Sequence, residues 1–170
     1  MGISAKDVNE LRKKTGSGMM DCKKALEESN GDLQAAIDFL RKKGQKIAAK
    51  RGDRDAKEGL VIAKTTSDNS KGVLICLNCE TDFVAKNEDF GKLANTIASI
   101  ATDNTPSNVD ELLGLSFDGN GLSIGDKITE QTGVIGEKIE ISGYELVEAV
   151  QVVAYNHPGN QIATIVGMNN

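Results

Sequence analysis

Residues 60–77 have the sequence LVIAKTTSDNSKGVLICL, in which two apolar runs flank a short polar segment. Residues 60–64 and 73–77 are rich in Val, Ile and Leu, as buried β-strands are. Residues 67–72, SDNSKG, contain the Ser, Asp, Asn and Gly residues that favour tight turns. The stretch therefore predicts an antiparallel β-hairpin, and a sheet that begins near residue 60.

The residues N-terminal to this hairpin predict three short helices. Ser4 and Asp7 have the spacing of a capping box at the start of the first helix. The second helix is expected over residues 19–28, after the break TGSG. Asp32 is a suitable N-cap for the third helix, which is expected to end at Gly44. The apolar residues of the third helix recur at helical spacing, and they are Leu33, Ala36, Ile37 and Leu40.

The residues C-terminal to the hairpin show both helical and strand patterns. A helix is expected from about Glu88, followed by short helices over residues 109–113 and 123–132. One further strand then precedes a final hairpin that pairs residues 150–155 with residues 162–166.

These patterns together predict an α+β fold, with helices packed on an antiparallel sheet. Four segments are expected. They are a three-helix N-terminal module over residues 1–44, a basic linker over 45–58, a first core subdomain over 59–148 and the start of a second core subdomain over 149–170.

Charge is distributed unevenly along the 170 residues. Residues 1–57 carry 14 Lys and Arg and 9 Asp and Glu, whereas residues 58–170 carry 6 and 16, so their net charges are +5 and −10. The basic half fits nucleic acid or an acidic protein surface, but the acidic remainder argues against wrapping nucleic acid. No apolar run approaches the roughly 20 residues that span a bilayer, and an odd count of three cysteines fits a reducing compartment. We expect a cytoplasmic protein without direct nucleic-acid or membrane binding.

The sequence lacks the motifs of a nucleotide-binding or hydrolytic enzyme. It contains no G-x-x-x-x-G-K-[ST] motif and no G-x-G-x-x-G motif, and nothing in it places a nucleophile beside its single histidine, His157. Cys76 and Cys79 have C-x-x-C spacing, but strand residues three apart face opposite sides of a sheet. A zinc site would need further ligands from distant segments. The sequence therefore predicts a protein that is not an enzyme, with no catalytic residue, cofactor or metal site.

Two longer motifs stand out, TGSGMMDCKKAL over residues 15–26 and NCETDFVAKN over residues 78–87. They resemble, in this order, the N-terminal and the second signature of the elongation factor Ts family. The resemblance covers nearly the whole chain. It implies a guanine-nucleotide exchange factor of translation elongation, which binds elongation factor Tu with GDP, displaces magnesium and promotes GDP release so that GTP can bind. It also implies a ubiquitin-associated-like fold for the N-terminal module.

The resemblance implies that the N-terminal module contacts elongation factor Tu. Arg12, Met19 and Met20 match the contact positions of the family. Methionines at the start of a helix are also common in hydrophobic cores, so the sequence leaves a core position open for them. Met is nevertheless well suited to adaptable interfaces.

The resemblance implies a second contact beside the nucleotide of elongation factor Tu. Thr81, Asp82, Phe83 and Val84 match the family segment that shifts the elements holding the magnesium ion and the phosphates. Without the family motif, Phe83 would be read as an ordinary core aromatic that follows a strand.

A third segment, residues 155–162 with the sequence YNHPGNQI, resembles a family hairpin that reaches the third domain of the partner. His157 and Gly159 match this hairpin, whereas Asn160, Gln161 and Ala163 replace the usual Gly, Arg and Gly. Most family members continue past this hairpin, so the chain looks C-terminally short. The apolar run 162–166 is then expected to form an uncovered edge strand, which a homodimer is one way of covering.

Three other functions each fit part of the sequence. A scaffold protein with a ubiquitin-associated-like module would explain residues 1–44 but not residues 81–84. An RNA-binding protein could use the basic stretch 42–57, although aromatic residues make up only 4% of the chain. A thiol redox enzyme could use Cys76 and Cys79, whereas an exchange factor would tolerate Ser at both positions.

Overall fold

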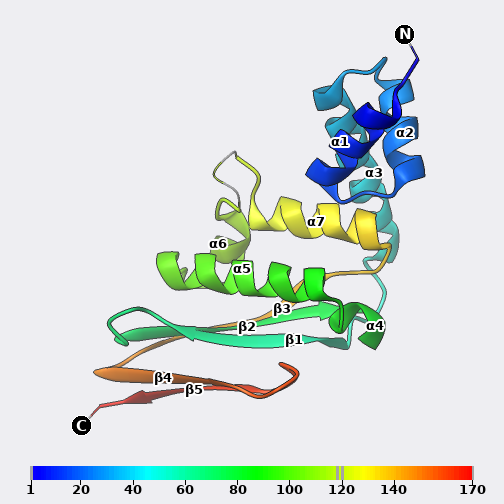
Figure 1. The fold of residues 1–170 in the computed structure, drawn as a ribbon. Coiled ribbons are helices and arrows are strands. Elements are labelled where there is room, and N and C mark those ends of the chain that lie inside the picture. The colour runs from blue at the N-terminus through cyan, green and yellow to red at the C-terminus, as the bar shows by residue number, and fades with distance from the viewer. Residues whose placement is uncertain (1, 118, 120, 170) are drawn as a thin grey trace. The chain divides into compact units, whose positions relative to one another are not determined.

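The structure is a computed structural model that describes residues 2–117, 119 and 121–169 (Figure 1). The chain divides into two compact units, one formed by residues 1–53 with 129–137 and the other by residues 54–128 with 138–170. Helices and antiparallel strands together confirm the predicted α+β fold class. No helix of the described residues is long and apolar enough to cross a membrane.

The first unit begins with three helices, α1 (Ala5–Thr15), α2 (Met19–Glu28) and α3 (Leu33–Arg51). The predicted capping box is confirmed: the Asp7 amide donates to Ser4 Oγ at 3.2 Å, and the Ser4 amide donates to Asp7 Oδ2 at 3.0 Å. The helices enclose an aliphatic core, whose buried members are Val8, Leu11, Cys22, Ala25, Leu26 and Ala36.

The prediction that Gly44 ends the third helix is wrong, because α3 continues to Arg51. Gly44 is buried where α3 crosses α7 (Ile124–Ile135), whose residues from Thr129 onward belong to this unit. A Cβ atom on Gly133 of α7 would lie 2.5 Å from Gly44 Cα, a distance that real side chains do not reach. Gly44 therefore allows two helix backbones to approach, and the first half of the expected linker is helical.

The second unit is built on a three-stranded antiparallel sheet in the order β1 (Glu58–Thr65), β2 (Lys71–Cys79) and β3 (Glu140–Glu148). The predicted first hairpin is confirmed, with Leu60 opposite Leu77 and Thr65 opposite Gly72. Short helices α4 (Asp82–Ala85) and α6 (Val109–Gly114) connect the larger elements.

Helix α5 (Glu88–Asn104) covers one face of this sheet, and strands β4 (Gln151–Asn156) and β5 (Ala163–Met168) cover the other (Figure 1). The predicted final hairpin is confirmed as a two-stranded antiparallel sheet. Gly72 permits the two sheets to pack, because a Cβ atom there would overlap the side chains of Ile165 and Val152.

The outward face of the β4–β5 hairpin is apolar and exposed. Val153 and Val166 lie opposite each other in the register and are about half exposed, as are Tyr155 and Met168. Contiguous exposed apolar side chains are a feature of protein–protein interaction surfaces. The homodimer suggested by the sequence stays a prediction.

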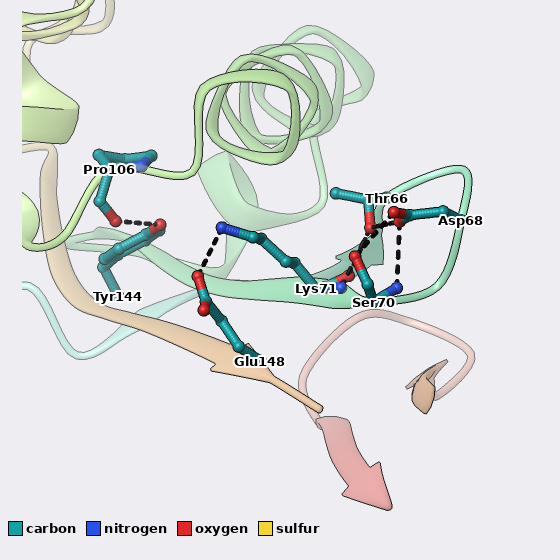
Figure 2. A network of polar contacts seen from close by, with 7 residues as sticks. All are labelled: Thr66, Asp68, Ser70, Lys71, Pro106, Tyr144 and Glu148. Carbon is teal, nitrogen blue, oxygen red and sulfur yellow. Dashed lines mark hydrogen bonds and ion pairs between the residues drawn. The ribbon is translucent and has the colours of Figure 1, made fainter. Parts of the chain in front are cut away.

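The turn between β1 and β2 is fastened by one carboxylate (Figure 2). Asp68 accepts hydrogen bonds from the Thr66 hydroxyl at 2.6 Å, the Ser70 amide at 3.1 Å and the Ser70 hydroxyl at 2.8 Å. These bonds, the one from Thr66 first, lower the pKa of Asp68 to about 2.

Strand β3 is joined to its surroundings by two further polar contacts (Figure 2). Glu148 pairs with Lys71 Nζ at 2.6 Å, which links β3 to β2. The Tyr144 hydroxyl donates to the Pro106 carbonyl at 2.7 Å, and burial raises the pKa of Tyr144 to about 12. The segment between α5 and α6 is thereby held against the sheet.

Candidate partner-binding site

The segment Thr81–Val84 forms a fixed helical turn at the end of β2. Thr81 is the N-cap residue of α4, and its carbonyl accepts the thiol proton of Cys79 at 3.2 Å and the amide of Ala85 at 3.2 Å. Ala85 is buried, and Asn87 then caps α5 by accepting from the Asp89 amide at 2.8 Å. The turn is therefore held between a central strand and the longest helix of the second unit.

Glu80 anchors the base of this turn. Its Oε1 accepts the backbone amide of Lys138 at 2.6 Å, and its Oε2 lies 3.8 Å from the guanidinium of Arg54. Only 13% of the Glu80 side chain is exposed. The partners of Glu80 are distant in the chain, so local sequence patterns do not reveal its role. Its place inside the NCETDFVAKN motif was the one available signal.

Phe83 is the most exposed large apolar side chain of the turn. Its relative exposure is 83%, whereas Phe90 on α5 is 2% exposed and supplies the core aromatic nearby. A core position for Phe83, which the sequence alone favoured, is therefore wrong. Val84 is half-buried beside it.

Asp82 and Lys86 form an ion pair across the same turn, with Oδ2 and Nζ 2.6 Å apart. The hydrogen bond from Lys86 lowers the pKa of Asp82 and raises that of Lys86. The pair is one helical turn apart and exposed, so its contribution to stability is small. Asp82 is thus ionised at neutral pH beside the exposed ring of Phe83.

The hairpin residues His157 and Gly159 lie at the same end of the three-stranded sheet as α4. Glu58 at the start of β1 is opposite Cys79 at the end of β2, and the Val61 amide donates to the Asn160 carbonyl at 2.7 Å. The turn adopts left-handed conformations at Gly159, with φ 90°, and at Asn160, with φ 53°.

The β4–β5 hairpin is also fastened to the free edge of β1 by a side-chain amide. Asn156 accepts the Ala63 amide at 2.8 Å and donates to the Ala63 carbonyl at 2.9 Å. His157 is exposed and its Nδ1 lies 2.9 Å from the Tyr155 hydroxyl. The hairpin is thus a positioned surface rather than a loose loop.

Arg12, Met19 and Met20 lie in the first unit, apart in the chain from the segments above. Met19 is 55% and Met20 is 74% exposed, while Cys22 and Leu26 of the same helix are buried. The core alternative is therefore wrong for both methionines. Arg12 is exposed, whereas its neighbour Leu11 is fully buried, so the Arg12 side chain points away from the core.

Cys76 and Cys79 lie on opposite faces of β2, as their spacing in a strand predicts. Cys79 is buried on the face of β2 that carries Ile75 and Leu77, while Cys76 lies on the other face and donates to Asn78 Oδ1 at 3.1 Å. Within the part of the chain that the structure describes, no three His, Cys, Asp or Glu side chains gather as metal ligands.

Comparison with known proteins gives the family. The family model described as "Elongation factor TS" matches residues 80–170. Proteins named Elongation factor Ts from Christiangramia forsetii, Flavobacterium psychrophilum and Rhodopirellula baltica are 58%, 55% and 53% identical to 98%, 96% and 96% of this chain. The chain spans 60%, 58% and 49% of their respective lengths. With the family model matching more than half of its residues, the chain belongs to the elongation factor Ts family.

Proposed function

We propose that the chain is a guanine-nucleotide exchange factor for elongation factor Tu in the cytoplasm, and that it works by binding rather than by chemistry. The observation that carries the proposal is the exposed ring of Phe83 on the fixed turn α4. Family membership supports the choice of partner.

An exposed Phe on a fixed turn is suited to insertion into a partner. Burying a Phe side chain contributes about 1.5–3 kcal/mol, and in this chain that energy becomes available only when a partner covers the ring. Because Glu80 and Ala85 already hold the turn, little conformational entropy is lost on binding. Phe83 can therefore stabilise one conformation of the partner over another.

The first unit supplies a second contact through Arg12, Met19 and Met20. Met side chains adapt to irregular surfaces, and Met20 is three-quarters exposed. When one chain carries two contact surfaces, formation of the first contact raises the effective concentration of the second surface near the partner. His157 and Gly159 are proposed as a third contact, on the same unit as Phe83.

Exchange by this route needs no covalent step. If the chain weakens the binding of GDP to elongation factor Tu, GDP weakens the binding of the chain by the same factor. We propose that insertion of Phe83 shifts the elements that hold the partner's magnesium ion, which otherwise balances the charge of the GDP phosphates. GTP then enters the empty site and releases the chain.

The test is stopped-flow release of a fluorescent GDP from elongation factor Tu. The intact chain should accelerate release, and Phe83→Ala should lose about 10- to 150-fold of the acceleration, the rate equivalent of the burial energy above. Val150→Ala is the matched control, since Val150 is 70% exposed but lies outside the predicted contacts. The proposal would be contradicted if the intact chain did not accelerate GDP release, or if both variants lost the same share of the acceleration.

A further inference from the structure

A basic groove lies between α2 and α3 of the first unit. It has a volume of about 270 Å³. We call it the α2–α3 groove, and its lining residues are Asp21, Lys24, Phe39, Lys42, Lys43 and Lys46. Most of these lysines belong to the basic stretch over residues 42–57. The proposed exchange function assigns no role to that stretch.

The charges of the groove are only partly compensated. Lys43 Nζ lies 2.5 Å from Asp21 Oδ1, so one lysine is paired inside the groove. Lys24, Lys42 and Lys46 are exposed and have no acidic partner among the residues that the structure describes. Lys42 and Lys46 are one turn apart on α3, where like charges repel each other. The groove therefore presents three unpaired positive charges.

The floor of the groove is apolar. Phe39 is half-buried and packs against the core of the three-helix unit, and its remaining surface lines the groove. Lysine stems add apolar surface while their ammonium groups stay at the rim. A ligand that fits must combine negative charge with an apolar contact.

We propose that the α2–α3 groove binds an acidic helical segment of a partner protein. Two carboxylates one helical turn apart on that segment match Lys42 and Lys46, because residues at i and i+4 have the same spacing on both helices. An aliphatic side chain of the segment covers Phe39. The proposal goes beyond the exchange function, since no residue of the groove belongs to the predicted contacts with elongation factor Tu.

The same features disfavour RNA as the occupant. Among the described residues, Phe39 is the one aromatic side chain that lines the groove, whereas proteins that bind single strands offer several aromatic side chains on which successive bases stack. Residues 58–170 carry a net charge of −10, which opposes a long polyanion more than a short acidic helix.

The proposal is tested with a fluorescein-labelled, alanine-based helical peptide that carries two Glu residues four positions apart and a Leu four positions further. Fluorescence anisotropy with the full chain should show saturable binding. The double variant Lys42→Glu, Lys46→Glu should weaken binding at least about tenfold, because two attractions become repulsions. A peptide with Gln in place of both Glu residues should lose binding to a similar extent.

The matched control is the double variant Lys6→Glu, Lys13→Glu, which changes the net charge equally. These lysines line a separate hollow on α1 that also contains a carboxylate, Glu10. The control should bind the peptide within about twofold of the original chain. Absence of peptide binding, or equal weakening in both double variants, overturns the proposal.

Two further outcomes would also overturn it. One is preferential binding of a single-stranded RNA oligonucleotide that is lost with Lys42→Glu, Lys46→Glu. The other is a concentration-dependent dimer of the chain, seen by sedimentation equilibrium, that the same variant abolishes.

Discussion

Substitution of Gly133 by Ala tests the close approach of α3 and α7. The new Cβ atom would lie 2.5 Å from the Cα atom of Gly44, and further contacts are with backbone rather than with the flexible end of a side chain. Overpacking of this kind costs about 1–3 kcal/mol, and a backbone neighbour that cannot change rotamer favours the upper part of that range. Ala is better than Gly in a helix by about 0.5–1 kcal/mol. The net loss of unfolding free energy is therefore about 1–2 kcal/mol.

Thermal unfolding followed by circular dichroism measures this loss. For a protein of this size, 1 kcal/mol corresponds to about 2–4 °C, so Gly133→Ala should lower the Tm by about 2–8 °C. Gly125→Ala is the matched control on the same helix, because a Cβ atom there would lie 3.4 Å from the nearest atom, an ordinary contact. Its Tm should be unchanged or higher. A Gly133→Ala protein as stable as the control would refute the helix contact.

Three further substitutions have definite expected results. Glu80→Gln keeps an acceptor for the Lys138 amide but loses the charge of the 2.6 Å hydrogen bond. It should therefore lower the unfolding free energy by about 1–2 kcal/mol and slow the GDP release from elongation factor Tu that the chain promotes. Unchanged values of both would contradict the anchoring role of Glu80. Tyr144→Phe leaves the Pro106 carbonyl unpaired and should cost about 1–3 kcal/mol. Because the folded pKa of Tyr144 is about 12, above its ordinary value of 10.0, the original chain should lose stability as pH rises from 10 to 12, and this part of the pH dependence should disappear in the variant. The pKa of Asp68 is lowered to about 2, so its ionised form contributes stability that is present above pH 4 and lost as pH falls toward 2. The difference in Tm between the original chain and Asp68→Asn should therefore shrink across that window. A constant difference would contradict the role of the Asp68 carboxylate in fastening the turn.

Much of the fold could be predicted because local chemistry determines it. The capping box at Ser4, the turn after Thr65 and the apolar spacing of α5 each involve neighbours in the chain. The prediction that Gly44 ends a helix is wrong because Gly44 contacts Gly133, which is distant in the chain. No local pattern distinguishes a Gly that ends a helix from one that lets two helix backbones approach.

The candidate site was predicted more by its motif than by its periodicity. Without the family motif, Phe83 is expected to be a core aromatic that follows a strand, and only the motif predicts a surface position for it. The four-residue helix α4 is too short to have a period. The anchor at Glu80 depends on Lys138, which is 58 residues away, so sequence spacing could not reveal it. The role of these residues in exchange stays a prediction.

The measurement that tests the central claim most directly is the affinity of the chain for elongation factor Tu with and without GDP, by isothermal titration calorimetry. An exchange factor stabilises the nucleotide-free partner, so saturating GDP should weaken binding of the chain by the factor by which the chain weakens GDP binding. Phe83→Ala should reduce that factor. Equal affinity for the free and the GDP-bound partner would contradict the account, because a chain that binds both states equally cannot shift the equilibrium between them.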